Sequence, residues 1–194
     1  MVDWWAVERD DRRVEYVAKP ATTLLLLCAA VALHPACRGE RIAVVIALAL
    51  CLAGDVFLML PSDQFVPGLA SFLVGHVAFV VGFVLGRGHH PLWVLTVPLA
   101  VLALGISARP VLRGAAAQDP KLRGPVVAYM SVIGAMLVFS ALPTNRLAIA
   151  GAAVFVVSDS ILARDRFVNR LNHGRLATMV TYHAALALIV LSLI

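Results

Sequence analysis

Charged residues are scarce in this chain. Only 14% of its 194 residues are charged and 61% are hydrophobic, whereas charged residues make up about 25% of a soluble globular protein. The apolar residues also lie in long blocks and not in the spaced pattern of a surface helix. This composition excludes a soluble globular fold, and the short connections between the blocks leave no room for a separate soluble domain.

Cysteine is scarce as well. The chain contains three cysteines, Cys28, Cys37 and Cys51, and no C-x-x-C pair. This pattern indicates neither a disulfide framework nor a zinc knuckle. We expect no metal and no cofactor.

Seven apolar blocks account for most of the sequence. Most contain about 17 to 20 residues, which is enough for a helix to cross the hydrocarbon core of a membrane. We therefore predict an all-α, polytopic transmembrane bundle of about seven helices, which forms a single domain over residues 19–194. Residues 1–18 are too charged to span and are expected to lie in the cytoplasm or at the membrane surface. The blocks are approximately 20–36, 41–60, 66–86, 91–107, 124–141, 146–163 and 175–193.

Lysine and arginine are unevenly divided between the two sides of a seven-helix arrangement. Twelve lie in the N-terminal segment and in the connections after the fourth and sixth blocks, and four lie on the other side. Because basic loops stay in the cytoplasm, we expect an integral protein of the plasma (inner) membrane with a cytoplasmic N-terminus. Topology then explains the net charge of +5, and we expect no nucleic-acid partner. The sequence leaves the oligomeric state open.

A weak internal repeat relates the first three helices to the last three. The stretch GDVFLML from Gly54 resembles SDSILAR from Ser158, and GLASFLVGHVAF from Gly68 resembles RLATMVTYHAAL from Arg175. Because four helices separate equivalent positions, both copies cross the membrane in the same direction. The sequence thus predicts two parallel three-helix repeats joined by helix 4.

The repeat places one aspartate in each copy. Asp55 and Asp159 both lie a few residues before the cytoplasmic end of their helices, in otherwise apolar sequence. An ionised aspartate at the bilayer centre costs about 2.5–3.5 kcal/mol, so an acid there is first interpreted as functional. We expect the two carboxyl groups to share one cavity, although capping or snorkelling is the simpler explanation for either one alone.

Five further polar residues are candidates for substrate binding: Lys19, His76, Tyr129, Tyr182 and His183. A histidine on an apolar helix is more often a hydrogen-bonded core residue, and tyrosines often only anchor or cross-link helices. Lys19 is equally suited to anchor the topology or to meet a phosphate. Together the histidines and aspartates could in principle bind zinc, but their spacing is not diagnostic of a metal site.

Several sequence blocks resemble the lysoplasmalogenase family of the YhhN type. The resemblance extends from about Lys19 to Ile189 and rests on the blocks KPATTLLLL, GDVFLML, GLASFLVGHVAFVVGF, VFVVSDSILA and MVTYHAALALI. It implies hydrolysis of the vinyl ether bond of a lysophospholipid, with Asp55 and Asp159 as the catalytic pair. The family is usually described with eight helices, and residues 1–18 of this chain do not provide the additional first helix.

The chemistry of a vinyl ether suits two membrane-embedded acids. Its hydrolysis begins with protonation of a carbon and passes through an oxocarbenium ion, so it needs one acid that keeps its proton and one carboxylate. The sequence does not say which aspartate has which role. The glycerophosphoethanolamine or glycerophosphocholine head is expected near Lys19 or Arg123. The alternative function is a small-solute or proton-coupled transporter with three, one and three helices.

Overall fold

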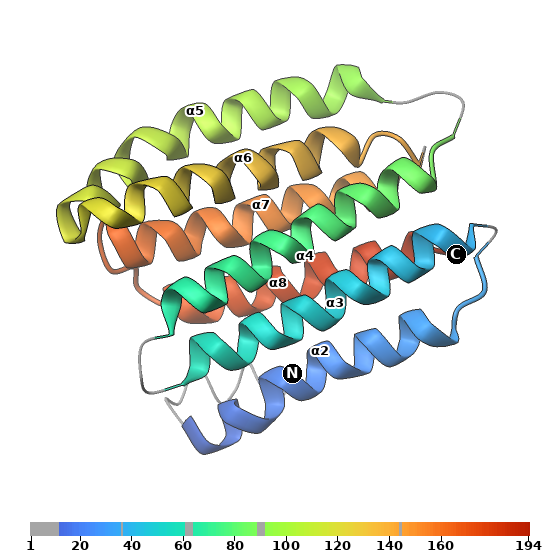
Figure 1. Cartoon of the computed structure of the whole chain (residues 1–194), viewed down its shortest axis with the longest axis horizontal. Coiled ribbons are helices and arrows are strands. Elements are labelled where there is room, and N and C mark those ends of the chain that lie inside the picture. The colour runs from blue at the N-terminus through green and yellow to red at the C-terminus, as the bar shows by residue number, and fades with distance from the viewer. Residues whose placement is uncertain (1–11, 36, 61–63, 89–91, 144) are drawn as a thin grey trace.

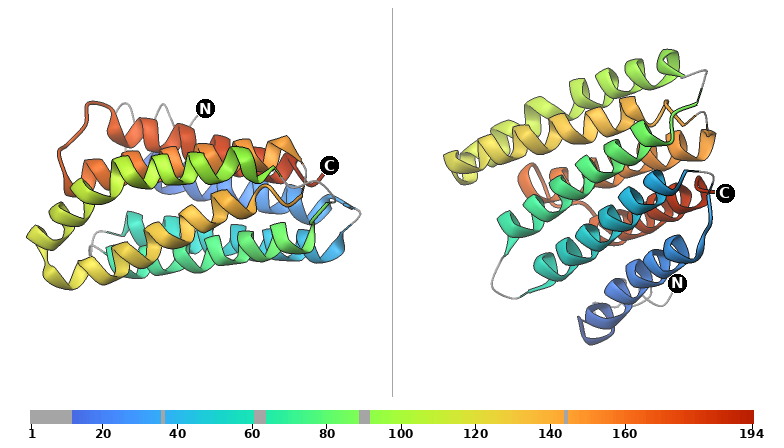
Figure 2. Two further views of the ribbon diagram at one scale, coloured as in Figure 1. Left: turned by 90° about the horizontal axis from the view of Figure 1, so that it is seen from above. Right: turned by 45° about the vertical axis from the view of Figure 1, so that its right-hand side comes forward.

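The computed structural model describes residues 12–35, 37–60, 64–88, 92–143 and 145–194. Every regular element in these segments is helical, and the helices run along the long axis of the molecule with their connections at its two ends (Figures 1 and 2). The elements are α2 (Arg12–Ala32), α3 (Arg38–Met59), α4 (Phe65–Leu85), α5 (Trp93–Gln118), η1 (Pro120–Leu122), α6 (Arg123–Phe139), α7 (Arg146–Phe167) and α8 (Gly174–Leu191). The predicted all-α bundle of seven helices is confirmed.

Six of these helices, α3 to α8, are long and apolar enough to cross a membrane. In α2 the apolar part, Lys19–Ala32, is shorter than this. The helix itself begins at Arg12, so Pro20 lies inside it and not at its start, where the sequence had placed it. A proline removes one backbone hydrogen bond, which α2 tolerates without ending. The remainder of the predicted surface segment, residues 1–11, lies outside the described residues.

Helix α5 is longer than its apolar block. The block was expected to end near residue 107, but the helix continues to Gln118, so Arg109 and Arg113 are helical and not in a loop. The extension packs against the end of α7, where a Cβ on Gly114 would clash with the Phe167 carbonyl oxygen. Hydropathy marks where a helix leaves the membrane, whereas α5 ends at the extended residue Asp119, which precedes Pro120.

The helices pack mainly in pairs, α3 against α4 and α7 against α8, while α2 covers α3 and α6 lies against α4 and α5. One apolar core joins them, and its largest fully buried side chains include Leu48, Phe79, Phe83, Met136 and Phe155. The two main pairs are equivalent in the predicted repeat, and the repeat itself stays a prediction. This packing brings α2, α3, α4, α6, α7 and α8 around the polar residues described below.

Gly114→Ala should lower the free energy of unfolding by about 1–3 kcal/mol, because the added methyl group must displace the backbone of α7. Gly105→Ala provides a matched control on the same helix, since nothing lies within 4 Å of a Cβ there. That change should be neutral or stabilise by up to about 1 kcal/mol through helix propensity. Denaturant unfolding in detergent micelles, followed by circular dichroism, compares the two; equal stabilities would contradict the close contact between α5 and α7.

Candidate active site

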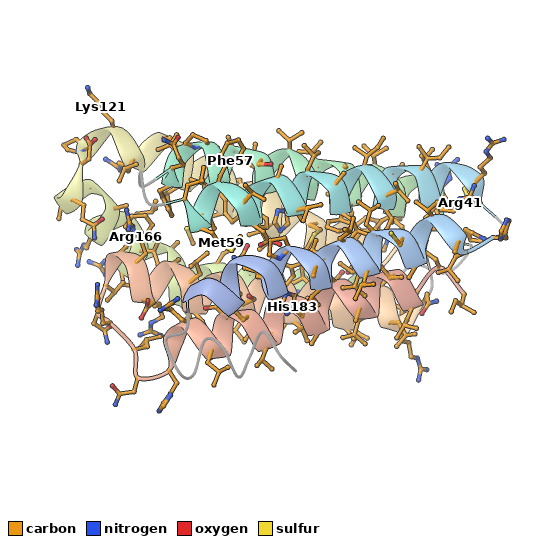
Figure 3. All side chains as sticks on the ribbon, turned by 90° about the horizontal axis from the view of Figure 1, so that it is seen from below. Arg41, Phe57, Met59, Lys121, Arg166 and His183 are labelled. Atoms are coloured by element: carbon orange, nitrogen blue, oxygen red, sulfur yellow. The ribbon has the colours of Figure 1, made fainter. Side chains whose placement is uncertain are left out.

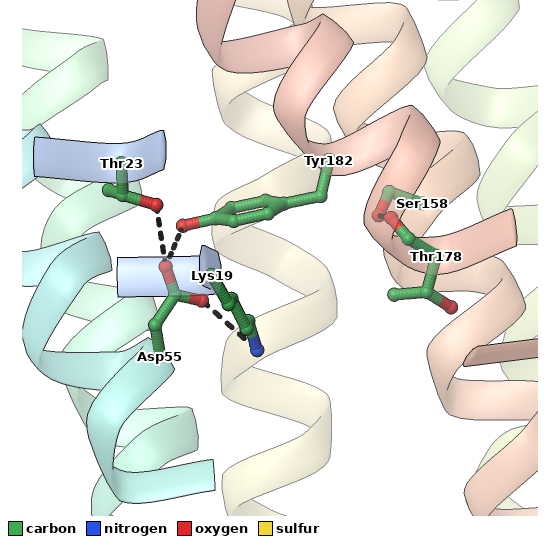
Figure 4. Close-up of polar contacts among 6 residues, drawn as sticks. All are labelled: Lys19, Thr23, Asp55, Ser158, Thr178 and Tyr182. Atoms are coloured by element: carbon green, nitrogen blue, oxygen red, sulfur yellow. Dashed lines mark hydrogen bonds and ion pairs between the residues drawn. The ribbon is translucent and has the colours of Figure 1, made fainter. Parts of the chain in front are cut away.

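Asp55, in the penultimate turn of α3, is fully buried and meets three donors (Figure 4). Its Oδ1 atom lies 3.2 Å from the ammonium group of Lys19. Its Oδ2 atom accepts hydrogen bonds from the Thr23 hydroxyl at 2.8 Å and from the Tyr182 phenol at 2.9 Å. A cation and two hydroxyl donors all favour the ionised carboxylate. Asp55 therefore joins α2, α3 and α8 through one anion.

Lys19 and Thr23 reach Asp55 together because they are four residues apart and lie on one face of α2. Both side chains are buried. The sequence shows no basic residue near Asp55, and Thr23 was not identified as a site residue. The Lys-x-x-x-Thr spacing was the available signal, but only the packing of α2 against α3 shows which acid these residues meet.

Asp159, on α7, has a different environment. Its Oδ2 atom accepts a hydrogen bond from the Tyr129 phenol of α6 and lies 3.8 Å from the Nε2 atom of His76 on α4. The Nδ1 atom of His76 lies 2.6 Å from the Phe72 carbonyl oxygen. A carbonyl oxygen can only accept, so Nδ1 carries a hydrogen and Nε2 faces Asp159.

Neighbouring side chains hold this second pair in place. The His76 ring is fully buried and packs edge-on against Phe155, with ring centroids 4.6 Å apart, and against Tyr129 at 5.3 Å. Beside Asp159, the Ser158 hydroxyl donates to the Thr178 carbonyl oxygen at 3.0 Å and ties α7 to α8 (Figure 4). The carboxyl group of Asp159 thus meets side chains of two other helices, α4 and α6, while the Ser158 hydrogen bond holds the adjacent part of α7 to α8.

Both aspartates line one cavity of about 1160 Å³. Its lining also includes the polar residues Lys19, Tyr129 and Tyr182 and several serines, and three arginines lie where it reaches the α7–α8 connection. The apolar part of its wall includes Leu58, Phe72, Leu104, Ile133 and Val156. A carboxyl pair, a long apolar wall and a basic end suit an amphiphilic, anionic ligand.

The structure separates the seven residues predicted for the site into two groups. Asp55, Asp159, Lys19, Tyr129 and Tyr182 line the cavity, whereas the described lining does not include His76 or His183. His76 lies behind Asp159, and the His183 ring lies 5.3 Å from that of Tyr182. Lys19, expected beside a phosphate, is instead the counter-ion of Asp55. Arg123, the other expected phosphate partner, is also outside the described lining.

A metal site can be assessed from the same residues. Within the described segments, no three histidine, cysteine or acidic side chains converge closely enough to hold a metal ion. Of the four residues that were considered as zinc ligands, His76 lies beside Asp159, whereas Asp55 contacts Lys19 and His183 packs beside Tyr182.

Known proteins resemble the chain over most of its length. It matches the YhhN family over residues 14–193. It is 38% identical to the human protein "Lysoplasmalogenase TMEM86B" over 146 residues, which are 75% of this chain and 61% of the human protein. Identity is 33% with the rat TMEM86B, over 75% of this chain and 59% of the rat protein. With the bovine "Lysoplasmalogenase TMEM86A" it is 34%, over 72% and 60%.

The chain thus spans about three fifths of the length of these curated relatives. No solved structure matches it.

Lys19 and Asp55 should be strongly coupled in stability, because removing either partner leaves the other charge buried without compensation. A double-mutant cycle with Lys19→Met and Asp55→Asn should give a coupling energy of about 1–3 kcal/mol. The cycle is measured by unfolding in detergent micelles. The control cycle pairs Lys19→Met with Asp159→Asn and should be additive; equal coupling in both cycles would argue against a specific ion pair.

Proposed function

We propose that this chain, which belongs to the YhhN family, hydrolyses the vinyl ether bond of lysoplasmalogens. The products are a fatty aldehyde and a glycerophospho head group, such as glycerophosphoethanolamine or glycerophosphocholine. Relatives named lysoplasmalogenase support this proposal. The observation that carries it is that Asp55 and Asp159 line one cavity, although they lie on two different helices that are long and apolar enough to cross a membrane.

The reaction consumes one water, and both carboxyl groups end in the protonation states in which they began. A carboxylic acid protonates the β-carbon of the alkenyl chain, and the electron pair of the C=C bond forms the new C–H bond, leaving an oxocarbenium ion. Water adds to the cationic carbon and gives up a proton to the second carboxylate. The resulting hemiacetal gives its hydroxyl proton to the carboxylate formed in the first step and breaks the bond to the glycerol oxygen, which takes the proton held by the second carboxyl group as it leaves.

Asp159 is the better candidate for the acid. The Nε2 atom of His76 lies 3.8 Å from it, whereas Asp55 faces the ammonium group of Lys19. Because Nδ1 of His76 already holds a hydrogen for the Phe72 carbonyl, Nε2 is an acceptor with no hydrogen-bond donor among the described residues, and a proton on Asp159 leaves this pair neutral in a low-dielectric site. That proton is the one available to the substrate, and His76 is a positioning residue that holds it on Asp159.

Asp55 is the corresponding carboxylate. Lys19, Thr23 and Tyr182 together keep it ionised, so it can stabilise the oxocarbenium ion and accept the proton from water. In this assignment Lys19 acts through Asp55, and Tyr129 and Tyr182 orient one carboxyl group each. His183 supports the ring of Tyr182 from outside the cavity.

The position of the site also suits a lysophospholipid that approaches from the membrane. The distribution of basic residues favours a cytoplasmic α7–α8 connection and N-terminus, in keeping with the predicted plasma (inner) membrane location. The head group then remains at the aqueous surface while the alkenyl chain lies along the apolar wall. The vinyl ether, between head and chain, reaches the level of the two aspartates.

Asp55→Asn and Asp159→Asn should each reduce turnover by about 100- to 10,000-fold, the usual contribution of a positioned acid or base. The assay measures aldehyde release from a lysoplasmalogen by purified protein in detergent, with the ester-linked analogue as a substrate control. In ¹⁸O-labelled water, the label should enter the aldehyde and not the glycerophospho product. Full activity in either Asn variant would exclude the carboxyl pair, whereas an inactive wild-type protein that moves a solute into proteoliposomes would favour the transporter.

His76→Phe should lower kcat by about 10- to 100-fold with little change in KM, because the ring position is filled but the proton acceptor beside Asp159 is lost. His76→Gln should retain more activity, since an amide oxygen can still accept a hydrogen bond from a protonated Asp159. Steady-state kinetics of both variants test this order. Equal losses, or a change confined to KM, would instead support a packing or substrate-binding role.

A further inference from the structure

The end of the cavity near the α7–α8 connection carries three arginines. We propose that Arg166, Arg170 and Arg175 bind the phosphate group of the lysophospholipid, as a phosphodiester attached to glycerol. All three line the cavity, and neither Lys19 nor Arg123 takes this role. The proposal rests on the function proposed above for the aspartate pair and defines how the head group of the same substrate is held.

The helical register places Arg166 at a suitable distance from the reacting bond. Arg166 follows Asp159 by seven residues, which is two turns along the same face of α7 and a rise of about 10 Å. In a lysophospholipid, the glycerol unit separates the vinyl ether from the phosphate. Long side chains on a helix point toward its N-terminus, which for Arg166 is the direction of Asp159, so the ether and the phosphate can be held at the same time.

A contact from α4 positions the Arg166 side chain, and a contact from α5 holds its backbone. Its guanidinium carbon lies 4.9 Å from the centre of the Phe65 ring, and the Gln118 side chain donates to its carbonyl oxygen at 2.8 Å. An arginine that serves only as a topology anchor needs no such placement. Figure 3 shows Arg166 at the end of the bundle that carries Lys121 and far from Arg41.

Among the described residues that line this end of the cavity, three arginines stand against one acid, Asp165. The Oδ1 atom of Asp165 accepts a hydrogen bond from the Leu171 backbone N–H at 2.8 Å. That bond shapes the loop that holds Arg170. Arginine suits a phosphate because its planar guanidinium can donate two parallel hydrogen bonds to the phosphate oxygens.

The test compares two non-hydrolysable ligands that differ in the phosphate. Purified protein in an uncharged maltoside detergent, with no anionic lipid, is titrated with 1-O-alkyl-glycerophosphocholine and with 1-O-alkylglycerol. Each of Arg166→Gln, Arg170→Gln and Arg175→Gln should weaken binding of the phosphate ligand about three- to tenfold, and the triple variant at least about tenfold, which corresponds to 1.4 kcal/mol. Binding of 1-O-alkylglycerol should not change, which also shows that the variants are folded.

Arg113→Gln and Arg123→Gln are matched controls. They remove positive charge at the same end of the molecule from exposed residues outside the described lining, and both should bind the phosphate ligand as the wild type does. Inorganic phosphate, added as a competitor, distinguishes a site for free phosphate from one for a lipid head group. If the site binds a lipid head group, inorganic phosphate should displace the lysophospholipid analogue only at a far higher concentration than that of the analogue itself.

Three outcomes would overturn the proposal: equal weakening of both ligands, unchanged binding in the triple variant, or inorganic phosphate binding as tightly as the lipid analogue. Because the titration needs no turnover, it is independent of the reaction. Selective loss of the phosphate ligand in a protein that releases no aldehyde would support the arginine site and reject the proposed hydrolysis. Normal aldehyde release with unchanged binding in the triple variant would reject the arginine site alone.

Discussion

The buried ion pair between Lys19 and Asp55 is the constraint on which the rest of the site depends. Neither charge is tolerated alone among apolar helices, because the loss of hydration far exceeds what an isolated hydrogen bond returns. The pair therefore fixes α2 against α3, and the hydroxyl groups of Thr23 and Tyr182 complete the coordination of the carboxylate and add α8. A helix whose apolar part is shorter than the other six is in this way held by charge as well as by packing.

The two aspartates of the site have different surroundings in this arrangement. Asp55 is surrounded by a cation and two hydroxyl donors, whereas Asp159 faces one phenol and one histidine. With the proton proposed for Asp159, each group is electrically neutral as a unit and leaves no uncompensated charge inside the bundle. The proposed roles of acid and carboxylate require this difference between the two aspartates.

The polarity of the cavity changes along its length. Arginines lie at the α7–α8 end, Asp159 lies two helical turns before Arg166 on α7, and much of the remaining lining is apolar. The α5 extension supports this order, since Gly114 and Gln118 hold the end of α7 where Arg166 begins the basic region. A single-chain ether phospholipid has a complementary order: a phosphate would face the arginines, the ether the carboxyl groups, and the hydrocarbon chain the apolar wall.

The sequence by itself determined the class of the fold and the two acids. Hydropathy is a local property, and an acid in a membrane helix is costly enough to be recognised from its neighbours alone. Only the tertiary structure decided the partners of each acid, the placement of His76 behind Asp159, and the helical state of Arg109 and Arg113. These helices are apolar on nearly every face, so their sequences do not indicate which face meets which neighbour. Contacts such as Tyr182 with Asp55 or His76 with Asp159 join helices that are distant in the chain, and packing alone brings them together.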